Sequence, residues 1–170
     1  MANNIVLIGM PAVGKSTAGV ILAKVLGYQF VDVDLEIQKQ EKRLLKDIIA
    51  QDGIDGFIKV ENRVNSELDI DNAVISTGGS VVYGQEAMEH LREIGTVVYL
   101  KLPYRVISRR LNNIEGRGVV LREGQTLKKL YDERVPLYEK YAHITVDETG
   151  LNIEKTVLRI IEEINKCQKN

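Results

Sequence analysis

Cysteine is almost absent from this 170-residue chain, which contains only Cys167. The chain therefore has no disulfide of its own and no cysteine-based zinc site, as is typical of proteins in a reducing compartment. Its first residues carry no basic segment, and the apolar run Ile5–Ile8 is far too short for a signal peptide or a membrane span. These absences predict a cytoplasmic protein that does not enter membranes.

An excess of positive charge is also absent. Lys and Arg number 23 against 24 Asp and Glu, and the sequence pI is about 6.2. Dedicated nucleic-acid binders usually show a basic excess, so we expect no nucleic-acid partner. His90 and His143 are isolated, with no partner at metal-ligand spacing, so no histidine-based metal site is expected.

Internal repeats and Ser/Gly/Pro-rich linkers are missing as well, although the chain is long enough for one domain of roughly 150 residues. Apolar residues make up 44% of the chain and charged residues 28%, which is ordinary for a globular protein. We therefore predict one domain over residues 1–170, and we expect it to act as a monomer on a small-molecule substrate.

Short β-like runs alternate with stretches in which apolar residues recur at helical spacing. The predicted strands cover residues 5–8, 28–33, 73–76, 96–102 and 144–146. Such alternation predicts an α/β fold of three layers, with a five-stranded parallel sheet between two layers of helices. Ligands of these folds bind at the carboxyl ends of the strands.

A phosphate-binding loop follows the first predicted strand. Gly9–Ser16 reads GMPAVGKS, which fits the pattern G-x-x-x-x-G-K-[ST] and opens a helical stretch. Its glycines allow backbone N–H groups to point inward at phosphates, Lys15 would reach the β- and γ-phosphates, and Ser16 would bind Mg²⁺. A simple glycine turn before a helix explains this combination poorly. The expected nucleotide-binding residues here are Gly9, Ala12, Val13, Gly14, Lys15, Ser16 and Thr17.

Two carboxylates, Asp32 and Asp34, end the second predicted strand. Because side chains alternate along a strand, the two would share one face near the phosphate loop. One could serve the metal, while the other could orient an acceptor hydroxyl and take its proton. The alternative for Asp34 is a helix N-cap.

Glycines and arginines supply the remaining candidates. Gly78 and Gly79 follow the third predicted strand and could bring backbone N–H groups close to an acceptor, although a simple turn is an equal alternative. Arg117, between two glycines, fits a mobile lid over about residues 112–124 that closes on the transferring phosphoryl group. Arg134 precedes Pro136, which we expect to disrupt a helix, and could hold an anion; the alternative is a surface ion pair with Glu133.

Together these segments resemble the shikimate kinase family, a small member of the nucleoside-monophosphate-kinase-like P-loop group. The segments that carry the resemblance are Gly9–Thr17, Asp32–Asp34, Thr77–Gly79, Arg117 with Leu121, and Glu133–Tyr138. The resemblance implies a sheet of strand order 2-3-1-4-5 with a lid. It also implies transfer of the γ-phosphate of MgATP to a hydroxyl of shikimate, giving shikimate 3-phosphate for aromatic amino acid biosynthesis.

The same resemblance assigns roles to individual residues. Lys15, Ser16 and Asp32 would bind MgATP. Arg110 would stack on the adenine and Arg117 would be the lid arginine. On the acceptor side, the resemblance implicates Asp34 at the hydroxyls, Gly78 and Gly79 as lining residues, and Arg134 at the carboxylate.

The chain departs from the family pattern at the acceptor carboxylate. Ile58 stands where the family has a second carboxylate-binding arginine, while Glu61, the usual partner of that arginine, remains. Ser80 replaces the third glycine of a triplet. Three functions therefore stay open: a shikimate kinase, a kinase for another hydroxylated acceptor such as a sugar acid, polyol or nucleotide, and a non-catalytic nucleotide-binding module.

Overall fold

The computed structural model describes residues 3–112, 119 and 121–167. Within these residues, five parallel strands form one sheet in the order β2-β3-β1-β4-β5, as expected. The strands are β1 (Asn4–Ile8), β2 (Gln29–Asp32), β3 (Ala73–Ser76), β4 (Gly95–Lys101) and β5 (Ile144–Asp147).

Strand β1 lies at the centre of the sheet and is buried along its whole length. Its Ile5 pairs with Val74 of β3 on one side and with Thr96 of β4 on the other. The run of apolar residues is continuous because helices cover both faces of the strand.

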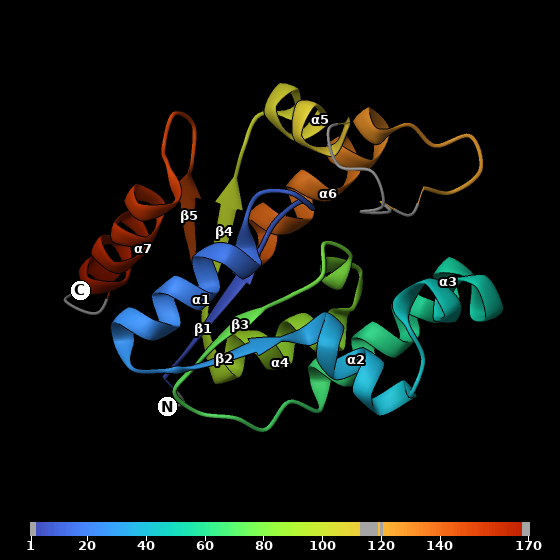
Figure 1. Cartoon of the computed structure of the whole chain (residues 1–170), viewed down its shortest axis with the longest axis horizontal. Coiled ribbons are helices and arrows are strands. Elements are labelled where there is room, and N and C mark those ends of the chain that lie inside the picture. Colours follow the sequence, from blue (N-terminus) through green and yellow to red (C-terminus); the bar gives the residue numbers. More distant parts are fainter. Residues whose placement is uncertain (1–2, 113–118, 120, 168–170) are drawn as a thin grey trace.

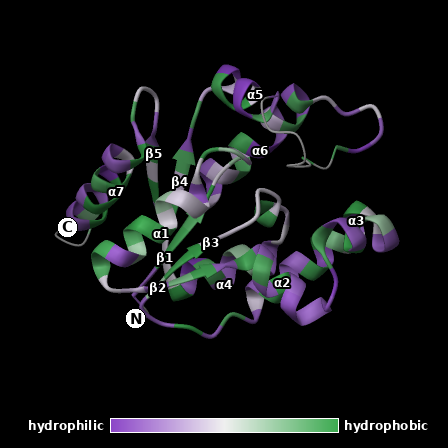
Figure 2. Ribbon diagram, in the orientation of Figure 1, coloured by the Kyte–Doolittle hydropathy of each residue, from purple (hydrophilic) through white to green (hydrophobic). Residues whose placement is uncertain are grey.

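Helices α1 (Lys15–Leu26) and α7 (Ile153–Cys167) cover one face of the sheet, and α4 (Gln85–Ile94) and α6 (Leu127–Tyr141) cover the other (Figure 1). Apolar residues gather on the strands, while the helices carry polar residues on their outer sides (Figure 2). The remaining helices are α2 (Val33–Glu41), α3 (Leu45–Ser66), the 3-10 turn η1 (Val81–Tyr83) and α5 (Tyr104–Asn112). No helix of the described residues is long and apolar enough to span a membrane.

Two sequence expectations about local structure were wrong. Strand β2 ends at Asp32, so Asp34 lies in the first turn of α2 and not at a strand end. Helix α6 passes through Pro136 without ending. A proline removes the hydrogen bond to the carbonyl four residues earlier, here that of Asp132. Both residues are exposed, so water can solvate that carbonyl.

Candidate active site

The phosphate loop lies between β1 and α1, at the carboxyl end of the central strand. Gly9 and Gly14 adopt φ angles of 148° and 98°, and Ala12 also has a positive φ of 67°. A Cβ at Gly9 would lie only 2.6 Å from the carbonyl oxygen of Leu100 on β4. The loop therefore needs glycine at this position both for its backbone angle and for its close contact with the neighbouring strand.

Lys15 is the buried cation of this loop, with a relative exposure of 8%. Its Nζ donates to the carbonyl oxygens of Gly9 at 2.8 Å and Met10 at 3.0 Å. Burial lowers the pKa of Lys15 to about 8, although the nearby Asp34 carboxylate opposes this shift. The ammonium group is thus held at the inner side of the loop. Anionic oxygens bound there would stabilise its positive charge, which burial has removed from water.

Asp32 connects the phosphate loop to the start of α2. Its Oδ1 accepts from the backbone N–H of Asp34 at 3.0 Å, so Asp32 is the N-cap of α2, and the alternative interpretation of Asp34 as the cap is not realised. Its Oδ2 accepts from Ser16 Oγ at 3.3 Å. Two oxygen ligands this close fit a hard cation such as Mg²⁺, which usually takes one or two protein ligands beside phosphates and water.

Asp34, Gly78 and Gly79 come together beside the loop. A Cβ at Gly78 would collide with Glu61 Oε1 and would lie 3.3 Å from Asp34 Oδ1. A Cβ at Gly79 would lie 2.9 Å from Nη1 of Arg134. The glycines are therefore needed because the side chains of Glu61, Asp34 and Arg134 lie too close to leave room for a Cβ. Burial, and then the neighbouring Asp32, raise the pKa of Asp34, which makes it a stronger base than an ordinary aspartate.

Arg134 is buried on α6, with a relative exposure of 7%. Its Nε donates to the Tyr83 hydroxyl at 3.4 Å, and its guanidinium lies 5.4 Å from the centre of that ring. The alternative of an ion pair with Glu133 is not realised, because Glu133 hydrogen-bonds the Tyr83 hydroxyl instead. Among the described residues, no carboxylate pairs with Arg134. A buried charge without a counter-ion is costly, which indicates an anionic ligand at this point.

Glu61 lies on the far side of Gly78 and is buried, with a relative exposure of 1%. Ser80 Oγ lies 2.5 Å from Glu61 Oε2, and Glu61 Oε1 has no hydrogen-bond partner in the described structure. Burial raises the pKa of Glu61 to about 7. Ile58, one turn earlier on α3, is only partly buried and offers Glu61 no charged partner.

The other candidate arginines lie around the phosphate loop and the expected lid. Arg110 is exposed, and its Nη1 donates to the carbonyl oxygen of Ala12 at 2.9 Å. Arg122, which lies within the expected lid range of residues 112–124, pairs with Asp55 of α3 at 2.5 Å. Arg117 and most of the expected lid lie outside the described residues.

Two functional candidates escaped the sequence analysis. Tyr138 donates its hydroxyl to the carbonyl oxygen of Gly79 at 2.5 Å and so supports the glycine pair. Glu148, directly after β5, is buried, and its Oε2 has no hydrogen-bond partner among the described residues. Burial raises its pKa to about 7 against the opposing charge of Arg110. The position of Glu148 after a strand end was a usable signal, because ligands of parallel sheets bind at that edge.

Glu148 also yields a prediction for stability. Its folded-state pKa of about 7 lies above the ordinary 4.5, so the folded state binds the proton more tightly and loses stability as pH rises from about 4.5 to 7. Replacing Glu148 with Gln removes this loss. In urea unfolding, we expect the free energy of unfolding of E148Q to exceed that of the wild type by a margin that grows by about 2–3 kcal/mol from pH 5 to pH 8. Glu162→Gln, at an exposed site on α7, is the control; an unchanged pH slope in E148Q would contradict the prediction.

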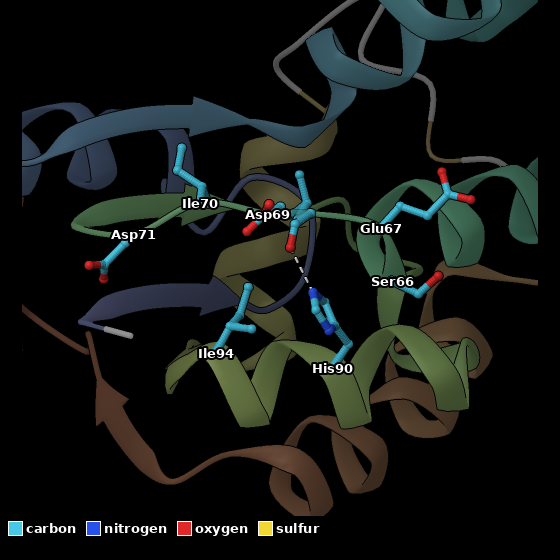
Figure 3. A pocket seen from close by; sticks show the side chains of 8 residues that line it. Ser66, Glu67, Asp69, Ile70, Asp71, His90 and Ile94 are labelled. Carbon is cyan, nitrogen blue, oxygen red and sulfur yellow. Dashed lines mark hydrogen bonds between the residues drawn. The ribbon is translucent and has the colours of Figure 1, made fainter. Parts of the chain in front are cut away.

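A hollow of about 680 Å³ lies at the opposite, amino-terminal edge of the sheet. Figure 3 shows it between the segment before β3 and helix α4, where His90 Nε2 lies 2.7 Å from the Leu68 carbonyl oxygen. Its other lining residues are Ser66, Glu67, Asp69, Ile70, Asp71 and Ile94. No residue of the candidate site faces this hollow.

Comparison with known proteins identifies the family. A sequence profile of shikimate kinase matches residues 11–165. The chain belongs to the shikimate kinase family. Shikimate kinases of Persephonella marina and Clostridium botulinum are each 35% identical to it, over 95% and 96% of this chain and 96% of theirs.

A solved shikimate kinase from Acinetobacter baumannii, in complex with shikimate, is 30% identical. It has a TM-score of 0.88 and covers 100% of this chain and 97% of that one. The expected fold and family are thus confirmed. The chain is a small-molecule kinase, and shikimate kinase membership implies ATP as the nucleotide substrate.

Proposed function

We propose that this protein transfers the γ-phosphate of ATP to the 3-hydroxyl of shikimate. The observation that carries the proposal is the buried guanidinium of Arg134, which has no described counter-ion and lies across Gly79 from the phosphate loop. Shikimate offers both groups that this arrangement needs, a carboxylate for Arg134 and hydroxyls for Asp34. The family relationship favours shikimate over the other hydroxylated acceptors.

The nucleotide side of the reaction rests on the phosphate loop. Backbone N–H groups of the loop and the amino end of α1 bind the phosphates, and Lys15 neutralises charge on the β- and γ-phosphates. Ser16 and Asp32 would hold Mg²⁺, which supplies further charge neutralisation on the phosphate oxygens. Arg110 would flank the adenine and Arg117 would act from the lid.

Asp34 acts on the acceptor. It accepts a hydrogen bond from the reacting hydroxyl and aligns its oxygen with the γ-phosphorus. A bond forms between that oxygen and phosphorus, the bond from phosphorus to the ADP oxygen breaks, and the hydroxyl proton passes to Asp34. The raised pKa of Asp34 suits this transfer. With Lys15 and Asp34 so arranged, a non-catalytic module is not favoured.

The direct test is ADP release from MgATP, measured by a coupled assay across a panel of acceptors. We expect turnover with shikimate at a sub-millimolar KM, and little or none with quinate, gluconate, simple polyols or nucleoside monophosphates. Turnover of another acceptor in place of shikimate would refute the proposal. Phosphorylated product identified by mass spectrometry excludes simple ATP hydrolysis.

A further inference from the structure

We infer that Ser80 is a positioning residue for the acceptor, because its hydroxyl holds the Glu61 carboxyl and so prevents Glu61 from pairing with Arg134. Arg134 then stays available for the acceptor carboxylate. This inference rests on the proposed function and deepens its acceptor site. It assigns a role to one of the two positions at which this chain departs from the family pattern.

The state of Glu61 is the first observation. The carboxyl is buried on α3, and the Ser80 hydroxyl is its one described hydrogen-bond partner, at Oε2. Oε1 is packed against Gly78 and has no hydrogen-bond partner within the described part of the chain. A buried carboxylate with half of its hydrogen-bonding capacity unmet will pair with any cation it can reach.

Arg134 is a cation within electrostatic reach. Glu61 packs against Gly78, and Arg134 packs against Gly79. Because these glycines are consecutive, the carboxyl and the guanidinium lie close to each other. Arg134 lowers the pKa of Glu61, although less than burial raises it, and Glu61 in turn raises the pKa of Arg134. Carboxylate and guanidinium form strong bidentate pairs, and such a pair would occupy the nitrogens that an acceptor carboxylate needs.

Other groups that face Glu61 do not replace Ser80. Asp34 on α2 repels it, while Lys15 on α1 is held by the carbonyl oxygens of the phosphate loop. Tyr138 on α6 donates its hydroxyl to Gly79. Position 58, where an arginine could serve Glu61, is isoleucine. The hydrogen bond from Ser80 is therefore what restrains Glu61.

The test compares S80A with the wild type at pH 6 and pH 8.5. Ser80 has φ −91° and ψ −2°, so alanine fits its backbone without strain. At pH 8.5, where Glu61 is ionised, we expect S80A to raise the KM for shikimate roughly tenfold, the size of one lost charged hydrogen bond. We expect kcat and the KM for ATP to stay within about twofold, and the shikimate effect to shrink at pH 6 as Glu61 becomes neutral.

Further variants isolate the cause. In the E61Q background, S80A should no longer change the KM for shikimate, because an amide does not neutralise Arg134. S80T keeps the hydroxyl and should restore a KM near that of the wild type, while S80G lacks the hydroxyl and should behave as S80A. Ser66→Ala, remote on α3, is the matched control.

Calorimetric titration of shikimate without nucleotide gives a readout apart from turnover, and S80A should weaken that binding at pH 8.5. An unchanged KM in S80A at pH 8.5, or an equal effect in the E61Q background, overturns the role of Ser80 alone. Wild-type protein that neither binds nor phosphorylates shikimate refutes the proposed function, and the role of Ser80 with it.

Discussion

Replacing Lys15 with methionine should lower kcat by about 10²–10³-fold or more, the loss typical of a donor aimed at developing charge in a transition state. Methionine fills a similar volume but carries no charge. Lys15 is buried at the inner side of the phosphate loop, where its Nζ donates to the carbonyl oxygen of Gly9. Steady-state kinetics with saturating ATP and shikimate measure the effect.

The control for this variant is Lys24→Met, at an exposed site on the same helix. Thermal unfolding shows whether K15M folds, and we expect no loss of stability, since a desolvated ammonium group is removed. A K15M protein that folds and retains more than a tenth of wild-type kcat would show that Lys15 does not bind the transferring phosphate.

Replacing Arg134 with methionine should raise the KM for shikimate roughly 100-fold, because up to two charge-assisted hydrogen bonds to the carboxylate are lost. The KM for ATP should change little, since Arg134 packs against Gly79 and its Nε donates to Tyr83, not to the phosphate loop. Arg134→Lys keeps the charge but not the planar pair of donors, so its KM for shikimate should lie between those of the wild type and R134M. Initial rates over a range of shikimate concentrations give these values.

Arg159→Met, at an exposed site on α7, controls for the loss of an arginine. The same R134M protein should not bind shikimate detectably in calorimetry at concentrations that saturate the wild type. Equal shikimate affinity in R134M and the wild type would exclude the carboxylate contact, and with it the feature on which the proposed function depends.

The general architecture was predictable because its causes are local. Continuous apolar strands alternate with amphipathic helices, and this pattern has few solutions other than a parallel sheet covered on both faces. The phosphate loop was predictable for the same reason, since its glycines, Lys15 and Ser16 lie within one short segment. Strand order, by contrast, came from the family resemblance and not from the pattern itself.

The parts that escaped prediction depend on contacts between distant segments. Ser80 and Glu61 lie 19 residues apart, and Tyr138 and Gly79 lie 59 apart, so no spacing rule relates them. The exposure that allows Pro136 inside a helix is likewise a property of the folded molecule. The end of β2 was misplaced because Asp32 can extend a strand or cap a helix, and only the folded chain decides between them.

The two oxygens of Asp32 have different partners, and this has a consequence for how such an enzyme evolves. One oxygen accepts from the first turn of α2, which carries Asp34, and the other accepts from Ser16, so Asp32 links two of the residues that we propose to act in phosphate transfer. Ile58 and Ser80 belong to α3 and to the turn before η1, outside that link. Mutations at these two positions can therefore retune which acceptor is accepted while leaving the transfer chemistry intact, so new substrate preferences can arise by small steps.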